Sequence, residues 1–291
     1  MMNILSDFNL SVDPEEVQQH IEKSRGAIPK GSNKELLKQI FGLIDLTTLS
    51  ERDNIENVSQ MCDKVNQLAE AYPAMPNIAA ICVYPELVSV VKDKLDNPLI
   101  NIASVGGGFP ASQTFTNIKV MEIEQAIEQG AEEIDMVMPV GKFLMDDLDI
   151  VNYEIQIIKQ RIGSIHLKVI LETGSLKDFS LIRKASLLAI GAGADFIKTS
   201  TGKISPGATP EAVAIMCCAI RDYYNRTGKK IGIKPAGGIS DPETALLYYH
   251  IVKGILGAEW LNRERFRIGA SRLANRILGD FFDKGHDFSY F

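Results

Sequence analysis

The feature of this sequence that most constrains its fold is an eightfold alternation of short apolar runs and longer amphipathic stretches. The short runs are rich in β-branched residues and predict buried strands, whereas the longer stretches have the spacing of amphipathic helices. Strands are predicted at 43–46, 77–83, 101–105, 133–138, 166–171, 194–200, 231–234 and 267–270. Helices are predicted at 55–71, 86–94, 118–129, 147–161, 181–189, 210–226, 242–253 and 271–283.

Because every predicted strand is followed by a helix, neighbouring strands are expected to be parallel with right-handed connections. Eight such units favour a closed (β/α)₈ TIM barrel over an open doubly wound sheet, and 291 residues suit one barrel with flanking segments. Residues 1–33 lie outside the repeat; Asp13-Pro14 predicts a short helix there, and residues 29–32 predict a linker. We therefore expect an N-terminal helical extension (1–33) and one barrel domain (34–291) ending in a tail (279–291).

Composition excludes several classes of protein. The net charge of −6 disfavours nucleic-acid binding, and no apolar run approaches the roughly 20 residues of a membrane span. The four cysteines form no C-x-x-C pair, which favours a reduced cytoplasmic protein. The four histidines are far apart and lack metal-ligand spacing, so no metal site is predicted.

Five charged residues interrupt strands that should be buried on both faces: Asp45, Asp135, Lys168, Lys198 and Lys234. Side chains alternate along a strand, and in each case the flanking apolar residues face the helices if the charge faces the barrel axis. One interpretation is a buried ion-pair network that only closes the core. Buried pairs contribute little to stability, so five such charges favour an active site instead.

The lysines indicate the chemistry. A lysine is normally protonated and a poor nucleophile, but desolvation and a neighbouring ammonium favour the neutral amine. Lys198 is predicted at the carboxyl end of its strand, where barrel active sites lie, and Lys234 lies on the next strand. We expect Lys234 to keep Lys198 partly neutral so that it forms an imine with a carbonyl substrate, with Asp135 relaying protons.

Glycine-rich segments follow the last three strands. Gly237-Gly238 follows the seventh, Gly269 to Ser271 accompany the eighth, and Thr201-Gly202-Lys203 follow the sixth. Loops after strands seven and eight often bind phosphate in this fold, through backbone N–H groups and a helix N-terminus. A tight turn alone is the alternative for the two glycines. Together the segments predict a sugar-phosphate substrate.

Six segments resemble the 2-deoxyribose-5-phosphate aldolase family of class I aldolases. They are DLTTL (45–49), AAICVYP (79–85), EIDMV (133–137), KVILETG (168–174), GADFIKTSTGK (193–203) and KPAGG (234–238). The resemblance spans about residues 40–272. It implies reversible cleavage of 2-deoxy-D-ribose 5-phosphate to acetaldehyde and D-glyceraldehyde 3-phosphate, without a metal or cofactor. It also implies a homodimer, since relatives are often dimers.

The resemblance assigns roles by position. Lys198 matches the Schiff-base lysine, Lys234 the lysine that perturbs it, and Asp135 the acid that handles protons. The substrate- and phosphate-binding positions are Asp45, Thr47, Lys168, Thr201, Gly202, Lys203, Gly237, Gly238, Gly269 and Ser271.

Three further positions either depart from the family pattern or have two interpretations. Relatives often end in a catalytic tyrosine, which here corresponds to the penultimate Tyr290. Arg272 stands where a second serine is common, and it is either a residue that strengthens phosphate binding, which we favour, or a surface charge. Cys82 is either a small buried residue or a thiol close enough to react with aldehydes. Two other functions stay open: another Schiff-base aldolase or transaldolase, and a non-catalytic sugar-phosphate sensor.

Overall fold

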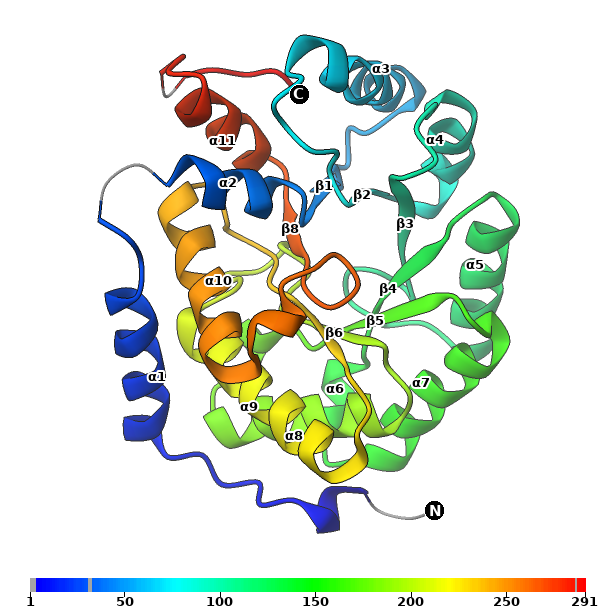
Figure 1. Cartoon of the computed structure of the whole chain (residues 1–291). Coiled ribbons are helices and arrows are strands. Elements are labelled where there is room, and N and C mark those ends of the chain that lie inside the picture. The colour runs from blue at the N-terminus through cyan, green and yellow to red at the C-terminus, as the bar shows by residue number, and fades with distance from the viewer. Residues whose placement is uncertain (1–3, 31–32, 286) are drawn as a thin grey trace.

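The eight predicted strands form one parallel sheet that closes into a barrel, which confirms the predicted (β/α)₈ fold (Figure 1). The computed structural model describes residues 4–30, 33–285 and 287–291. Residues 31 and 32 of the predicted linker, and His286, lie outside these ranges. The sheet order is β7-β6-β5-β4-β3-β2-β1-β8. Parallel bridges between Ile233 and Phe266 and between Ala236 and Gly269 join β7 to β8 and complete the circle.

The strands are short and contribute buried residues to the barrel. They are β1 (Ile44–Thr47), β2 (Ala80–Val83), β3 (Asn101–Gly106), β4 (Glu133–Val137), β5 (His166–Ile170), β6 (Phe196–Lys198), β7 (Gly232–Lys234) and β8 (Ile268–Ala270). Several are shorter than predicted. Ile78 and Ala79 before β2, and Thr199 and Ser200 after β6, are as buried as strand residues, so burial extends beyond the regular ladder.

The main helices surround the strands. Those that follow a strand are α3 (Ile55–Ala71), α4 (Val88–Lys94), α5 (Thr116–Glu128), α7 (Leu148–Ile162), α8 (Phe179–Gly191), α9 (Pro210–Thr227), α10 (Pro242–Leu256) and α11 (Leu273–Phe281). Short 3₁₀ turns η1 to η4 occupy Ile4–Asp7, Pro85–Leu87, Thr173–Ser175 and Ala258–Trp260. Among the described residues, no helix is long and apolar enough to cross a bilayer.

The helix starts follow local chemistry. Thr209 accepts a hydrogen bond from the backbone N–H of Ala212, and Asp241 accepts one from Thr244, each just before a proline at the first helical position. Asp13 caps the predicted extension helix in the same way. These caps place α9 and α10 directly after the loops that leave β6 and β7.

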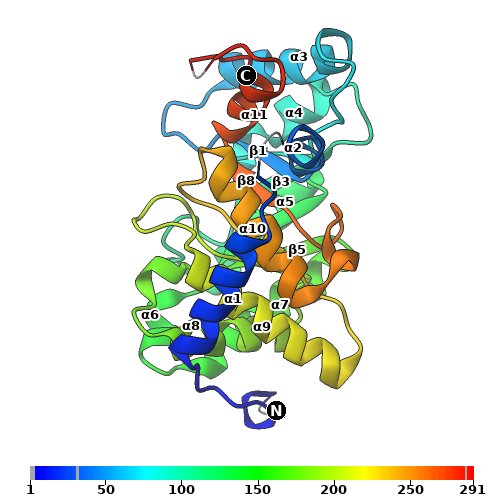
Figure 2. The same ribbon diagram turned by 60° about the vertical axis from the view of Figure 1, so that its left-hand side comes forward.

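The extension is a helix packed against the outside of the barrel. Helix α1 (Pro14–Gly26) lies along α9 and α10 (Figure 2). The hydroxyl of Ser24 donates a hydrogen bond to the carbonyl of His250. The sequence did not predict two further helices, α2 (Lys34–Phe41) and α6 (Val140–Leu144). Both are too short for their apolar periodicity to stand out, and α2 is held by packing against α10 and α11.

Candidate active site

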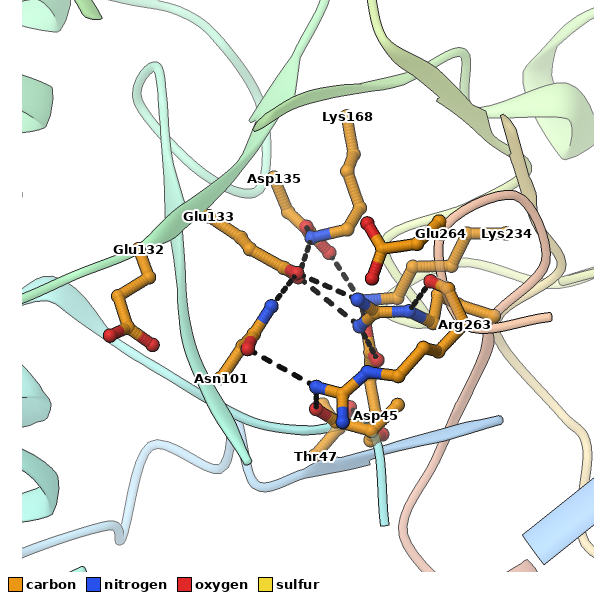
Figure 3. A network of polar contacts seen from close by, with 12 residues as sticks. Asp45, Thr47, Asn101, Glu132, Glu133, Asp135, Lys168, Lys234, Arg263 and Glu264 are labelled. Atoms are coloured by element: carbon orange, nitrogen blue, oxygen red, sulfur yellow. Dashed lines mark hydrogen bonds and ion pairs between the residues drawn. The ribbon is translucent and has the colours of Figure 1, made fainter. Parts of the chain in front are cut away.

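The five charged residues predicted to face the barrel axis all lie in one buried cluster. Asp45, Asp135, Lys168 and Lys234 have no exposed surface, and Lys198 is only 2% exposed. Their side chains come from β1, β4, β5, β6 and β7. Figure 3 shows Asp45, Asp135, Lys168 and Lys234 pointing toward one another. The alternation of side chains along each strand therefore placed these residues correctly.

Asp135 is the centre of the cluster. Its Oδ2 accepts hydrogen bonds from Lys198 Nζ and from Lys234 Nζ, both at 2.7 Å. Its Oδ1 lies 3.1 Å from Lys168 Nζ, an ion pair without a directed hydrogen bond. Burial alone would raise the pKa of Asp135, but the charges of the three lysines hold it well below its ordinary value. Asp135 is thus a carboxylate shared by three amines.

Two further buried residues, which were not predicted as site residues from the sequence, complete the cluster: Glu133 and Arg267. Arg267 Nη1 donates to Asp45 Oδ1 at 2.7 Å, and Nη2 donates to Glu133 Oε1 at 2.7 Å. Lys168 Nζ donates to Glu133 Oε2. A signal was present, because Glu133 lies two residues before Asp135 and so faces the same side of β4.

The charge states of the surrounding cations follow from their partners. Burial would lower the pKa of Lys234, but Asp135 and Asp45, the latter at 2.5 Å, raise it above its usual value. Likewise, burial opposes the charge on Lys168, yet Asp135 and Glu133 raise its pKa. Lys234 is therefore the cationic neighbour that the sequence predicted for Lys198, and the two are register partners on β6 and β7.

The carboxylates on the far side of the cluster are ionised for the matching reason. Burial would raise the pKa of Asp45, but Lys234 and Arg267 hold it below its ordinary value. Burial would also raise the pKa of Glu133, but the charges of Lys168 and Arg267 lower it. Both carboxylates are therefore ionised even though they are buried.

A pocket of about 250 Å³ opens above the cluster at the carboxyl ends of the strands. Its lining includes Lys198 but neither Lys168 nor Lys234, which lie beneath it. Most of the substrate-binding positions predicted from the sequence line it: Thr47, Thr201, Gly202, Lys203, Gly237, Gly238, Gly269 and Ser271. Asp45 and Lys168 do not line it and belong to the buried cluster. Arg272 lines the pocket as well, directly before α11.

Backbone, rather than side chains, forms one wall of this pocket. Gly237 has a φ of +88°, and a Cβ there would lie 3.2 Å from the Cα atoms of both Gly202 and Gly207. A Cβ on Gly207 would approach the Gly237 carbonyl oxygen to 2.3 Å. The loops after β6 and β7 are in direct backbone contact, so the glycines are required by close packing as well as by turn geometry.

A buried glutamate after β5 fixes the loop that carries Thr201. Glu172 accepts hydrogen bonds from the Thr201 backbone N–H at 3.1 Å and from its hydroxyl at 2.5 Å. Glu172 is 5% exposed and has a left-handed backbone, φ 55°. The rim is closed further by Lys203 Nζ, which donates to the carbonyl of Leu49. The sequence matched Glu172 to a motif without indicating this role.

The structure does not bring Tyr290 to the pocket. Its hydroxyl donates to the Lys64 carbonyl at 2.9 Å, and its ring packs edge-on against Tyr72 with centroids 5.1 Å apart. The backbone N–H groups of Tyr290 and Phe291 both donate to Asn275 Oδ1. These contacts bind the tail between α3 and α11, on the outside of the barrel, and so oppose the catalytic placement expected for this residue.

Cys82 lies on β2 in a small apolar group with Ala80, Ala103 and Val105, and it is fully buried. Burial raises the pKa of its thiol. The small-buried-residue interpretation therefore describes its environment. Within residues 4–30, 33–285 and 287–291, no group of three or more His, Cys, Asp or Glu side chains is arranged to hold a metal ion.

Comparison with known proteins gives a consistent family. Residues 40–253 match the model of the DeoC/LacD family aldolases. Human deoxyribose-phosphate aldolase is 42% identical over 257 residues, covering 83% of this chain and 79% of the relative. The mouse enzyme of the same name is 40% identical over 274 residues, covering 89% and 84%.

Solved structures agree with this result. QR15, an aldolase, superimposes with a TM-score of 0.67 at 28% identity and covers 84% of this chain and 99% of its own. The deoxyribose phosphate aldolase from Aeropyrum pernix, described as a tetramer, has a TM-score of 0.64 over 94% of this chain and all of its own, but at 23% identity it supports the fold alone. The chain therefore belongs to the DeoC/LacD family of aldolases.

Proposed function

We propose that this chain is a deoxyribose-phosphate aldolase that forms a Schiff base on Lys198. It would reversibly cleave 2-deoxy-D-ribose 5-phosphate to acetaldehyde and D-glyceraldehyde 3-phosphate. The substrate follows from the family and from relatives that are named deoxyribose-phosphate aldolase. The catalytic residue follows from the site.

One observation carries the assignment of the nucleophile. Of the three lysines in the buried cluster, Lys198 alone lines the pocket. Lys168 and Lys234 each contact two carboxylates beneath it and are held as cations. Lys198 therefore combines access to a substrate carbonyl with direct contact to Asp135, a carboxylate that can accept its proton.

The chemistry follows from this placement. Lys198 Nζ attacks the C1 carbonyl of the open-chain sugar, and the carbinolamine loses water to form an iminium ion. The 3-hydroxyl then loses its proton, the C2–C3 bond breaks, and the electron pair moves toward the iminium nitrogen, which leaves an enamine and D-glyceraldehyde 3-phosphate. Protonation of the enamine at C2 and hydrolysis release acetaldehyde and regenerate Lys198.

Asp135 is the group best placed to move protons at nitrogen. Its Oδ2 lies 2.7 Å from Lys198 Nζ. Because the pKa of Asp135 is held well below its ordinary value, it begins as a carboxylate that accepts a proton rather than as an acid that donates one. It can then return that proton as water leaves the carbinolamine.

The opposite wall of the pocket suits the substrate phosphate. Gly202, Gly237 and Gly238 offer backbone without side chains, and Lys203 and Arg272 supply positive charge. Ser271 and Arg272 precede the N-terminus of α11, where free backbone N–H groups favour an anion.

Borohydride trapping tests the nucleophile. Acetaldehyde and borohydride should add a two-carbon group to Lys198, located by peptide mass spectrometry, and the adduct should disappear in Lys198→Leu. Lys229 is an exposed lysine, and Lys229→Leu is the matched control that should retain labelling. An adduct found only on surface lysines would contradict the assignment.

The main competing function is a Schiff-base aldolase or transaldolase with a different substrate. Such an enzyme would also trap on Lys198. A coupled assay that detects D-glyceraldehyde 3-phosphate separates the two, because only a deoxyribose-phosphate aldolase releases it together with acetaldehyde from 2-deoxyribose 5-phosphate. A sugar-phosphate sensor would bind the substrate without trapping or turnover.

We also propose that the enzyme works without a metal, as a homodimer, in a reducing cytoplasmic compartment. The Schiff-base scheme needs no Lewis acid, and the cysteines Cys62, Cys82, Cys217 and Cys218 are all free. Dialysis against a chelator should leave the cleavage rate intact. Complete loss that zinc restores would support a metal-dependent aldolase, and analytical ultracentrifugation tests the dimer.

A further inference from the structure

Six of the buried charges form a closed ring in which every carboxylate lies between two cations. The ring runs through Asp45, Lys234, Asp135, Lys168, Glu133, Arg267 and back to Asp45. Five of the six contacts have N···O distances from 2.5 to 3.1 Å, and the sixth joins Lys168 to Glu133. The ring therefore holds three anions and three cations that balance each other.

Lys198 is the seventh charge and stands outside this balance. Each ring cation contacts two carboxylates, whereas Lys198 ion-pairs only with Asp135 within the part of the chain that the structure describes. Asp135 Oδ2 already accepts a hydrogen bond from Lys234. With Lys198 protonated the cluster carries one excess positive charge, and with Lys198 neutral it carries none. A buried charge without a compensating partner is costly, so the charge count of the ring bears on Lys198.

The other groups around Lys198 lie outside the ring. Cys82 is a neutral thiol on β2, because burial raises its pKa. The cations Lys203 and Arg272 share the pocket with Lys198 and add positive charge at its rim. Glu172, the buried carboxylate after β5, is already bound by the backbone and hydroxyl of Thr201.

Two ring members lie at the opposite end of the lumen from the pocket. Glu133 is the first residue of β4, and Arg267 precedes the first residue of β8. Neither lines the pocket. Arg267 reaches both Glu133 and Asp45 through its two terminal nitrogens, so it is the member that closes the ring across the barrel.

We propose that Arg267 and Glu133 are positioning residues that set the protonation of Lys198 through the charge balance of the ring, without touching the substrate. The proposal rests on the proposed Schiff-base role of Lys198. Loss of the Arg267 charge would leave the ring at −1, so that protonated Lys198 becomes the balanced state. Loss of the Glu133 charge would leave the ring at +1 and favour neutral Lys198 more strongly.

The two substitutions should therefore move the pH profile in opposite directions. The measurement is the rate of acetaldehyde trapping on Lys198, together with kcat/KM for cleavage, from pH 5 to 10. Arg267→Met should move the acid limb upward by about one pH unit, and Glu133→Gln should move it downward by a similar amount. The double variant restores a neutral ring and should return the limb close to its wild-type position.

Opposite shifts and their cancellation separate charge balance from a general loss of packing, which would lower the rate without moving the profile in both directions. Shifts of the same sign, or no shift in any variant, would overturn the proposal. Arg267→Lys is a further control, because it keeps the charge and loses the two-armed contact; its profile should stay at the wild-type position. Glu133→Gln is nearly isosteric, so if Arg267→Met does not fold, an unshifted or upward-shifted Glu133→Gln profile alone refutes the proposal.

The outcomes also distinguish this proposal from the one on which it rests. Wild-type protein that traps no acetaldehyde on Lys198 at any pH would reject the Schiff-base assignment itself. Normal trapping with unshifted profiles in the variants would reject only the charge-balance role of Arg267 and Glu133.

Discussion

The two ends of the barrel lumen handle charge in opposite ways. Toward the amino end, Glu133, Arg267 and Asp45 are fully buried and each meets oppositely charged partners. At the carboxyl end, the exposed Lys203 and Arg272 stand beside glycine backbone around an open pocket. Lys198 lies where the two regions meet.

This difference separates two tasks. Charges that must not reorganise during a reaction are fixed from several sides and shielded from water, which makes their field strong and permanent. Groups that capture a mobile anion must stay reachable and tolerate water, so their individual contributions are smaller and depend on salt. Substitutions at the amino end should therefore affect stability and chemistry together, and those at the carboxyl end should affect binding alone.

The largest effect is expected at the junction. Lys198→Leu removes the proposed nucleophile and should lower the cleavage rate of 2-deoxyribose 5-phosphate by at least about 10³-fold. Its folding should remain cooperative, because Lys198 contributes no contact that closes the ring. The coupled assay measures the rate, and Lys229→Leu should match wild type. A rate within tenfold of wild type would remove Lys198 from the mechanism.

The next effect tests the claim that the buried end combines chemistry with stability. Asp135→Asn leaves Lys168 and Lys234 with one carboxylate each, so it should lower the free energy of unfolding by about 3–5 kcal/mol as well as the rate by about 10²-fold. Urea denaturation and the coupled assay give the two values. Full stability with a reduced rate would show that the ring does not depend on Asp135.

The pH dependence of stability should also originate at the buried end. Asp45, Glu133 and Asp135 have lowered pKa values when folded, so their stabilisation is present above the unfolded values near ~4 and is lost as pH falls. We expect the free energy of unfolding to fall by about 2 kcal/mol or more between about pH 5 and 3. Glu133→Gln should reduce this slope. Equal slopes in both proteins would place the titrating groups elsewhere.

A smaller effect is expected at the pocket end. Gly237→Ala places a methyl group against the backbone of Gly202 and Gly207 and should raise KM for 2-deoxyribose 5-phosphate about tenfold. Gly238→Ala is the matched control, because that site also has positive φ but open space around it. With unphosphorylated 2-deoxyribose, the two variants should behave alike. A loss that is equal with both substrates would argue against a phosphate contact.

The smallest effect is expected in the tail. Tyr290→Phe removes the hydrogen bond to the Lys64 carbonyl and should lower the free energy of unfolding by less than about 1 kcal/mol. Hydrogen exchange at the enamine carbon, followed by NMR of acetaldehyde in deuterated buffer, should stay within twofold of wild type. A tenfold slowing would show that Tyr290 leaves α3 and reaches the pocket during turnover.

Much of the fold was predictable because it follows from the spacing of apolar residues along the strands and helices. The eight strand–helix units gave the barrel, and side-chain alternation brought Lys198, Lys234 and Asp135 to one lumen. Strand ends and the short helices α2 and α6 were missed. Their burial and boundaries depend on packing between distant segments, which no local pattern encodes.

The candidate site was predicted at the residues that break the apolar pattern inside a strand. Arg267 was missed because it lies at a strand boundary, where a charge is unremarkable, and its partners are 222 and 134 residues away in sequence. The buried charges do form an ion-pair network, and this network lies directly beneath the pocket of the candidate site. Tyr290 was predicted to reach the site but lies elsewhere. The position of this chain end is set by its contacts with Tyr72 and Asn275 rather than by local sequence.

The closed ring also restricts how this barrel can evolve. A single substitution that removes one ring charge leaves a buried partner uncompensated, which typically costs about 3–5 kcal/mol. Lineages should therefore lose or exchange these charges in opposite-sign pairs, such as positions 133 and 267, or retain all six. An alignment in which these two positions vary independently would contradict this expectation. If the expectation holds, the six ring residues are inherited as one unit, while the residues around the pocket change one at a time.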